Sequence, residues 1–384
     1  MKTVCQMDAC TGCMACLELC PAKAIHIEDS LASYNAVIDE TLCIHCDACH
    51  KGCQNNNEIT YQKPYLWKQG WAADHDIRKA SSSGGVATEI ARSFVRLGGV
   101  VCSCVFSAGE FSFAFAVTED DVGKFTGSKY VKSAPRGIYR KLKELLTSQK
   151  KVLFIGLPCQ VSAVKLFVGE RLRRNLYTID LICHGTPSPR LLRTFLNQYG
   201  VDISEKDNIM FRNKGNVVLQ KSVQYIDKKN ASDRYTIAFL HSLIFTDNCY
   251  QCAYAKEERV SDLTLGDSWG SELSTEEKQK GISLVLCQSK KGEELLQASD
   301  LFLTEVSAEK AVQSNHQLEH PSPKPPVRMK FFRGMEKGKK FNTVVFRCYP
   351  KQCVKQRLKG ILSCLKVYKG AGIYRISVQE KTSE

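Results

Sequence analysis

Residues 10–21 read CTGCMACLELCP, and residues 43–53 read CIHCDACHKGC. Both stretches hold four cysteines at one spacing, with two, two and three residues between successive thiols, and nine of the chain's 19 cysteines fall before residue 54. We find no apolar signal-peptide core ahead of them and no uncharged apolar run of membrane-spanning length after them. Disulfides of a secreted domain are therefore not expected, and the clustering predicts metal ligands in a cytoplasmic protein.

This spacing is that of bacterial ferredoxins with two [4Fe–4S] clusters, in which three cysteines of one run and the last cysteine of the other hold each cluster. It predicts two ligand sets: Cys10, Cys13, Cys16 and Cys53 for one cluster, and Cys43, Cys46, Cys49 and Cys20 for the other. A pair of zinc sites is the alternative, although zinc more often takes C-x2–4-C pairs. Gln54 follows Cys53 where Pro21 follows the first run, and Cys5 lies outside the pattern as a structural or spare thiol.

Beyond residue 62 the pattern changes to mixed α/β. Helical spacing appears at 84–97 and 137–149, apolar strand-like runs at 99–106, 152–155 and 176–183, and alternation at 111–117. Short strands are expected at 24–27 and 36–38. The expected fold class is therefore α+β or mixed α/β, with a small dicluster ferredoxin domain over residues 1–62 and a mixed α/β domain over residues 63–320.

The C-terminal segment, residues 321–384, is strongly basic. Between Lys324 and Arg375 there are fifteen Lys or Arg and one acidic residue, so this stretch carries a charge equal to the whole net charge of +14. Four prolines between 321 and 326 predict an extended linker. Apolar residues at 354, 358, 361, 362 and 365 predict a basic amphipathic helix, which fits an anionic membrane, an acidic partner or its own domain equally. No aromatic platform for nucleic acid accompanies the charge.

Five motifs in the middle region resemble those of the family of coenzyme F420 (deazaflavin) hydrogenase/dehydrogenase beta subunits. They are SSGG at 82–85, GSKY at 127–130, GLPCQ at 156–160, DLICHG at 180–185, and Cys249-x2-Cys252 followed by Asp262 and GDSWG at 266–270. Residues 210–214, MFRNK, also resemble a family segment, although the family more often continues with Gly-Trp where this chain has Gly-Asn. The resemblance covers about residues 5–270 in the family's order.

The resemblance implies an FAD-containing oxidoreductase whose middle domain binds the flavin and a third [4Fe–4S] cluster. It implies the cluster ligands Cys159, Cys183, Cys249 and Cys252, and flavin contacts from Ser82, Ser83, Gly84, Gly85, Ser128 and Lys129. The residues alone leave other interpretations open. Only Cys249 and Cys252 have metal-type spacing, whereas Cys159 and Cys183 also fit buried thiols at strand ends. The serines fit a plain helix N-cap, and Lys129 fits a solvated loop lysine.

The leading functional hypothesis is an iron–sulfur flavoprotein oxidoreductase that passes electrons between a one-electron carrier such as ferredoxin and a two-electron acceptor, through the clusters and FAD. The alternatives are a non-catalytic relay subunit of a larger redox complex and a cluster-binding redox sensor without flavin. No catalytic residue is assigned, since His184 fits a hydrogen bond to a cluster or the backbone as well as a proton donor. The expected location is cytoplasmic or peripheral to a membrane, and the small-molecule substrate is not encoded in any motif.

Overall fold

The computed structural model describes residues 1–212, 223–365 and 375–380. The N-terminal part consists of β1 (Lys2–Thr3), α1 (Ala15–Leu19), β2 (Ile25–Asp29), β3 (Tyr34–Ile38), α2 (Ala48–Lys51) and η1 (Gln54–Asn56). Its strands form one sheet in the order β1-β3-β2. Met14 and Asp47, at equivalent places in the two cysteine runs, both take left-handed backbone conformations just before a short helix. The repeated spacing therefore folds as a repeated loop.

The middle part is built on an eight-stranded sheet in the order β13-β4-β12-β11-β8-β7-β5-β6. The strands are β4 (Leu66–Ala72), β5 (Val100–Ser107), β6 (Glu110–Ala116), β7 (Val152–Gly156), β8 (Leu176–Leu181), β11 (Leu263–Asp267), β12 (Ser283–Cys287) and β13 (Leu301–Glu305). β5, β7, β8 and β11 run parallel, and antiparallel strands extend the sheet on both sides. The expected mixed α/β class and its strands at 99–106, 111–117, 152–155 and 176–183 are confirmed.

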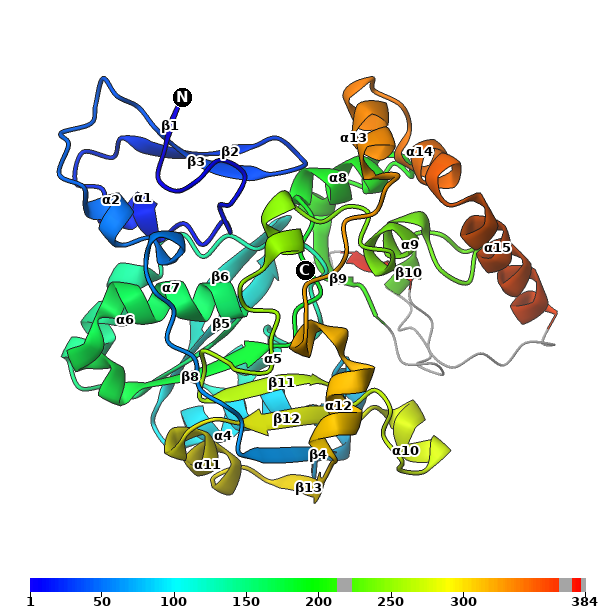
Figure 1. Cartoon of the computed structure of the whole chain (residues 1–384). Coiled ribbons are helices and arrows are strands. Elements are labelled where there is room, and N and C mark those ends of the chain that lie inside the picture. Colours follow the sequence, from blue (N-terminus) through cyan, green and yellow to red (C-terminus); the bar gives the residue numbers. More distant parts are fainter. Residues whose placement is uncertain (213–222, 366–374, 381–384) are drawn as a thin grey trace.

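Helices cover both faces of this sheet (Figure 1). β7 is buried throughout, as expected of a central parallel strand. Its Leu153 and Ile155 pack toward one face, with α4 (Val86–Arg96), α5 (Glu119–Gly123) and α11 (Lys290–Gln297). Val152 and Phe154 pack toward the other, with α6 (Tyr139–Thr147) and α7 (Pro158–Val168). α3 (His75–Ala80), α10 (Thr275–Lys280), α12 (Ala308–Ser314), η2 (Glu170–Asn175) and η5 (His316–Leu318) complete this part.

The N-terminal part packs directly on the α6 and α7 layer. Cys13 and Ala15 belong to the same buried hydrophobic cluster as Val161 and Val164 of α7. In Figure 1 the N-terminal part, in blue, lies above α6 and α7. The contact brings the first cysteine run against the middle part of the chain.

A third region joins the segment 189–251 to the C-terminal segment. It contains α8 (Pro189–Asn197), η3 (Ile203–Glu205), β9 (Lys206–Met210), β10 (Val223–Tyr225), α9 (Arg234–Leu240), η4 (Asp247–Gln251), α13 (Arg328–Glu336), α14 (Phe341–Cys348), α15 (Pro350–Cys364) and β14 (Ser377–Glu380). β14 pairs with both β9 and β10. Phe331 and Phe341 are fully buried with Phe195 and Tyr235, so the basic segment shares a core with residues that lie far before it in the sequence.

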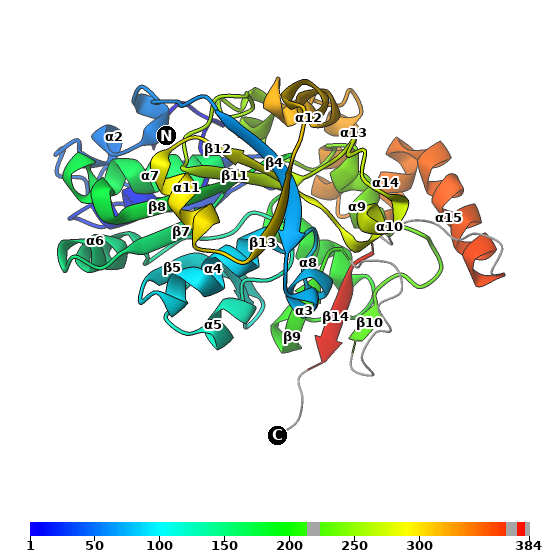
Figure 2. The same cartoon turned by 90° about the horizontal axis from the view of Figure 1, so that it is seen from below.

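The predicted amphipathic helix is present as α15, which extends from the side of the molecule away from the eight-stranded sheet (Figure 2). Cys353 is buried, and a Cβ at Gly360 would lie 2.5 Å from the Lys229 carbonyl oxygen, so this narrow face contacts the protein. None of the helices within the described residues combines the length and apolar character needed to cross a membrane.

Candidate functional site

The first predicted ligand set lines one cavity in the N-terminal part. Cys10, Cys13, Cys16 and Cys53 are all buried and all border this cavity, although Cys53 comes from the second run. Gln54 is buried beside them, where its amide nitrogen donates to Thr11 Oγ1 at 2.8 Å and its oxygen accepts from Cys13 Sγ at 3.4 Å. Four thiols around one cavity are the donor set that a [4Fe–4S] cluster takes, so these residues fit the first predicted cluster. We call it the inner cluster and its four cysteines the inner set.

The second predicted set lies closer to the surface. Cys20, Cys43 and Cys49 are half-buried and Cys46 is exposed. Burial raises the pKa of Cys49, and the nearby thiols of Cys20 and Cys46 raise it further. Leu42 and Ile44, beside these cysteines, are exposed as well. We call these four cysteines the outer set, because solvent or a partner protein reaches them.

The third predicted set comes together at the edge where the parallel strands end. Cys159 is the second residue of α7, directly after β7, and Cys183 follows β8 by two residues. Burial raises the pKa of both thiols, and each also interacts electrostatically with Cys249 and Cys252. The Thr186 amide donates to Cys249 Sγ at 3.4 Å. Carboxyl ends of parallel strands share one edge of a sheet, which explains why residues far apart in sequence meet here.

None of the three cysteine sets is gathered as tightly as the ligands of a single metal ion. Among the described residues, no group of three or more His, Cys, Asp or Glu side chains could hold a metal ion. The third cluster therefore remains a prediction, which the electrostatic interactions among its four thiols support.

A buried ion pair fixes the loop that carries this third set. Arg259 donates to Asp180 at 3.0 Å, with both side chains almost fully buried. The same guanidinium donates to the carbonyl oxygens of Tyr254 at 2.9 Å and Leu181 at 3.2 Å. Arg259 thus ties the chain after Cys252 to the end of β8, just before Cys183.

Two buried side chains lie between the inner set and the third set. Tyr139 is fully buried and its hydroxyl donates to the Cys13 carbonyl oxygen. Burial raises the pKa of Tyr139, and the thiols of Cys13 and Cys159 both raise it further, so this ring is close to both sites.

Lys132 is 4% exposed and donates to the Thr11 carbonyl oxygen at 3.0 Å. The hydrogen bond that Cys10 donates to Cys5, together with burial, raises the pKa of Cys10, and burial raises the pKa of Cys159, whereas the Lys132 charge lowers the pKa of both thiols. The ammonium therefore favours thiolates at both sites.

The two predicted flavin-binding motifs contact each other. Ser82 Oγ accepts from the Ser128 amide at 2.8 Å, which joins the loop before α4 to the loop before Tyr130. Ser83 donates to the Ile282 carbonyl oxygen at 2.9 Å, and a Cβ at Gly84 would lie 2.3 Å from the Gly70 carbonyl oxygen. Gly85 precedes α4 with a φ of 87°. The glycines thus serve close packing and a left-handed turn at the start of α4.

Lys129 is not a solvated loop residue. Its ammonium donates to the carbonyl oxygens of Phe125 at 2.7 Å and Thr126 at 3.1 Å. Burial lowers its pKa, while nearby Cys104 raises it. The Lys129 side chain therefore lies inside the loop that contacts Ser82.

His184 lies in a group of polar side chains next to the third set. Gln317 Nε2 is 2.8 Å from His184 Nδ1 and 2.7 Å from His316 Nε2. Burial lowers the pKa of His184, and His316 lowers it further, whereas Asp267 raises it. Asp267 forms an ion pair with Arg212, which also lies over the Trp269 ring. The rest of the MFRNK segment, Asn213 and Lys214, lies outside the described residues.

Sequence reasoning missed Lys132, Tyr139 and Arg259. No local spacing distinguishes them, because each contacts a residue more than seventy positions away in the sequence. Gln54 carried a local signal, since it replaces the proline that follows the first cysteine run.

Residues 9–62 match the model of a 4Fe-4S dicluster domain. Residues 68–136 match the N-terminal part, and residues 149–310 the C-terminal part, of the coenzyme F420 hydrogenase/dehydrogenase beta subunit. The chain belongs to this family of coenzyme F420 hydrogenase/dehydrogenase beta subunits. Both halves of the family's model occur in order behind a dicluster domain, as the five motifs predicted.

Relatives of this beta-subunit chain are distant. It is 22% identical over 191 residues to an F(420)H(2) dehydrogenase subunit of Methanosarcina mazei, and the match covers 47% of this chain and 54% of that protein. It is 25% identical over 192 residues to an uncharacterized protein of Methanocaldococcus jannaschii, with 41% and 52% covered. The chain thus spans about half the length of the curated relatives it matches.

Among solved structures, the chain is similar to one from the F420-reducing [NiFe] hydrogenase complex of Methanosarcina barkeri. The TM-score is 0.47 at 17% identity, with 67% of this chain and 91% of that chain covered.

Proposed function

We propose that this beta-subunit chain passes electrons between a ferredoxin-like one-electron carrier and a two-electron acceptor, through three [4Fe–4S] clusters and FAD. The observation that carries the proposal is that the inner and third cysteine sets share buried neighbours. Tyr139 interacts with Cys13 and Cys159, and Lys132 interacts with Cys10, Cys159 and Cys183. Cys159 and Cys252 also pack against the hydrophobic cluster that contains Cys13, which supports electron transfer between the two sites.

Exposure orders the sites along this path. The outer set contains exposed Cys46, the inner set is buried, and the third set is half-buried at the carboxyl edge of the sheet. An external carrier therefore exchanges electrons at the outer cluster, and the third cluster serves the acceptor. Either direction of flow is compatible with this order.

The flavin site that we propose is the start of α4 together with the loop 127–130. Free amides at a helix N-terminus suit a pyrophosphate, and the contact between Ser82 and Ser128 makes the two motifs one surface. Ser82, Ser83, Gly84, Gly85, Ser128 and Lys129 would hold the cofactor. When bound, FAD supplies the exchange between one-electron and two-electron chemistry.

The test is the cofactor content of anaerobically purified protein. We expect about twelve iron atoms per chain, four for each of three clusters, together with one released FAD. Cys183→Ala is expected to remove the iron of the third cluster and leave the two dicluster signals in the electron paramagnetic resonance spectrum. Cys287→Ala, at a buried thiol outside all three sets, is the matched control. Unchanged iron in Cys183→Ala eliminates that ligand.

A second candidate is a non-catalytic relay subunit of a larger redox complex. It is favoured by the name of the Methanosarcina mazei relative, which is one subunit of a dehydrogenase. This candidate predicts clusters and flavin but no turnover by the isolated chain, with reduction of coenzyme F420 as the first assay.

A redox sensor without flavin predicts iron but no flavin absorbance and no flavin release on denaturation.

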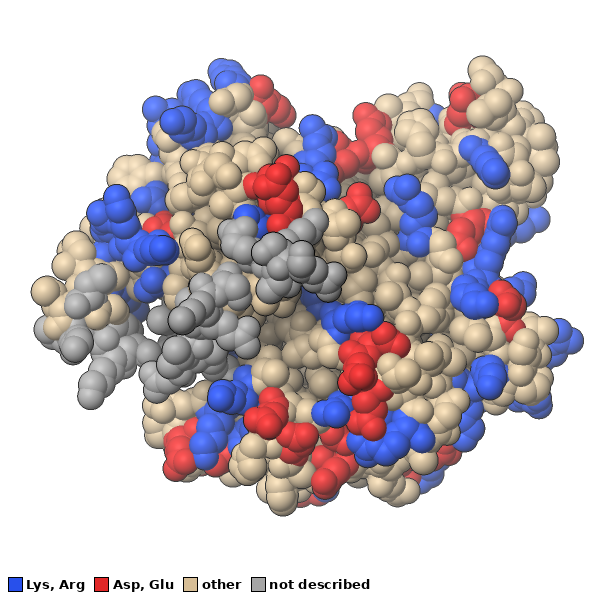
Figure 3. All heavy atoms as spheres, turned by 180° about the vertical axis from the view of Figure 1, so that it is seen from behind, with Lys and Arg blue, Asp and Glu red and all other residues tan. Residues whose placement is uncertain are grey.

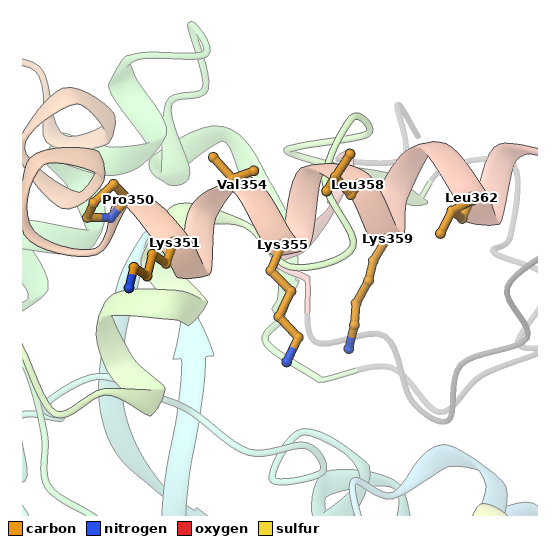
Figure 4. A pocket seen from close by; sticks show the side chains of 7 residues that line it. All are labelled: Pro350, Lys351, Val354, Lys355, Leu358, Lys359 and Leu362. Carbon is orange, nitrogen blue, oxygen red and sulfur yellow. The ribbon is translucent and has the colours of Figure 1, made fainter.

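We further propose that α15 lies on an anionic membrane surface. Its apolar residues Val354, Leu358, Ile361, Leu362 and Leu365 are between 40% and 65% exposed, although Cys353 on the neighbouring face is buried. Figure 4 shows Lys351, Lys355 and Lys359 in a row along one side, with Val354 and Leu358 projecting from the other. Seen from behind, Lys and Arg gather around α13–α15, whereas both signs mix over the rest of the face (Figure 3). An apolar stripe beside a row of lysines fits the boundary between acyl chains and anionic headgroups.

A further inference from the structure

The cavity of the inner cluster is bordered by five thiols, although a [4Fe–4S] cluster takes four. Cys5, outside the ferredoxin spacing, lines the same cavity as Cys10, Cys13, Cys16 and Cys53. It follows β1, whose pairing with β3 continues in the hydrogen bond from the Val4 amide to the Ala36 carbonyl oxygen at 2.9 Å. The Cys5 side chain is 8% exposed. The sheet thus holds a fifth thiol against the cluster site.

Cys5 contacts two particular ligands of the set. Its thiol lies within hydrogen-bonding reach of Cys10 and Cys53, and the Asn55 side-chain amide donates to its sulfur at 3.6 Å. Asn55 is itself held by a 2.7 Å hydrogen bond to the Ala9 carbonyl oxygen. The Cys5 sulfur is therefore held beside two of the four proposed ligands.

A buried free cysteine commonly serves only as a small apolar side chain. The surroundings of Cys5 differ from that case, because two thiols and an amide donor surround its sulfur. An amide that donates to sulfur stabilises a thiolate, which is the form that binds iron. Cys13 has a different partner, since its thiol donates to Gln54 Oε1 at 3.4 Å.

We propose that Cys5 is a reserve ligand of the inner cluster, placed to bind the iron of Cys10 or Cys53 when either ligand is lost. The proposal rests on the dicluster assignment and deepens it. In the exchange, the bond between iron and the Cys10 sulfur breaks, a bond to the Cys5 sulfur forms, and the Cys5 proton moves to the departing sulfur. No oxidation state changes.

The experiment compares ligand variants of the full chain with and without Cys5. Each single variant, Cys10→Ala or Cys53→Ala, is expected to retain the inner cluster after anaerobic reconstitution with iron and sulfide. When Cys5→Ala is added to either of them, the double variant is expected to lose about four iron atoms per chain. Cys13→Ala is the internal control, because the Cys13 thiol donates to Gln54 rather than to Cys5. It loses the inner cluster whether or not Cys5 is present.

Iron content and paramagnetic resonance spectra of the reduced proteins give the readout. The proposal is overturned if both Cys10→Ala and Cys53→Ala lose the inner cluster whether or not Cys5 is present. If the wild-type protein holds no iron in residues 1–62, the dicluster assignment is overturned instead.

A second measurement covers variants that fail to fold. Cys5→Ala alone keeps every proposed ligand and is expected to shift the reduction potential of the inner cluster to a more negative value, because a hydrogen-bond donor to its ligand sulfurs is removed. Cys102→Ala, at a buried thiol of β5, leaves that potential unchanged. If the inner cluster has the same reduction potential in Cys5→Ala as in Cys102→Ala, the proposed contact between Cys5 and the ligand sulfurs is contradicted.

Discussion

At the scale of single residues, buried charges position the cysteine ligands. Asp180 and Arg259 form the most deeply buried ion pair among the described residues, and Arg259 also binds three backbone or side-chain acceptors of its own loop. Such a pair holds geometry more than it adds stability, since desolvation offsets much of the attraction. Removal of one partner is costly because it leaves the other charge buried.

Arg259→Met is therefore expected to lower the free energy of unfolding by about 3–5 kcal/mol and to reduce the iron of the third cluster. Anaerobic denaturant unfolding and iron analysis measure the two effects. Lys141→Met, which breaks the exposed pair with Glu144, is the control and should cost no more than about 1 kcal/mol. A loss of that small size in Arg259→Met would contradict the role of the pair.

Lys132 supplies a positive charge to two cysteine sets at once. Reduction adds negative charge to a cluster, and a buried cation nearby stabilises the reduced form. Lys132→Met is therefore expected to shift the reduction potentials of both the inner and the third cluster to more negative values, while the outer cluster changes little. Potentiometric titration followed by paramagnetic resonance measures this, with exposed Lys124→Met as the control. A shift confined to one cluster would place Lys132 at that site alone.

At the scale of elements, the turn after β8 depends on one glycine. Gly185 has a φ of 130°, and a Cβ there would lie 2.4 Å from the Phe245 ring. Gly185→Ala is expected to displace the turn that carries Cys183 and to lower the free energy of unfolding by about 1–3 kcal/mol. Thermal unfolding and third-cluster iron report the effect. Gly123→Ala, in α5 with no atom within 4 Å of the new Cβ, should be neutral or stabilising.

The exposed stripe of α15 makes a prediction about membranes. Full-length protein is expected to cosediment with vesicles that contain anionic lipid, and to do so less at high salt because its lysines are screened. Leu358→Gln with Leu362→Gln removes apolar contact and should abolish binding, whereas Lys141→Gln, at an exposed lysine of α6, should not. Equal sedimentation with neutral vesicles, or none with either, would favour an acidic protein partner.

At the scale of the whole molecule, the packing of the dicluster part on α6 and α7 determines which cluster faces inward. Cys13 is in the same hydrophobic cluster as Val161, while Cys46 is exposed. Equal spacing in the two runs thus leads to unequal positions, one at the surface and one buried against the middle part.

Loss of the outer cluster is expected to isolate the remaining clusters from a protein donor. Cys46→Ala should remove about four iron atoms and slow reduction of the inner cluster by reduced ferredoxin in stopped-flow measurements, while small reductants still reduce it. An unchanged rate with ferredoxin would show that the carrier docks elsewhere.

Local patterns predicted much of this protein. Apolar runs identified the central strands because a strand buried on both faces has no polar alternation, and the cysteine spacing identified two clusters because tight loops require ligands at fixed separations. Apolar residues three and four apart identified α15. The sharing of one core by Phe331, Phe341 and residues of α8 and α9 had no local signal, since their contacts join distant segments.

The sequence by itself determined the central strands β5, β6, β7 and β8, the helices α4, α6 and α15, the four cysteines of each run and the membership of the family, because these depend on residue types at short separations. Only the tertiary structure decided which cysteine run faces inward, that Lys132 and Tyr139 lie between two cysteine sets, and that Cys5 borders the inner cavity. Those features arise from the packing of one layer against another, and a buried charge or thiol acquires its role from neighbours that the chain brings together only when it folds.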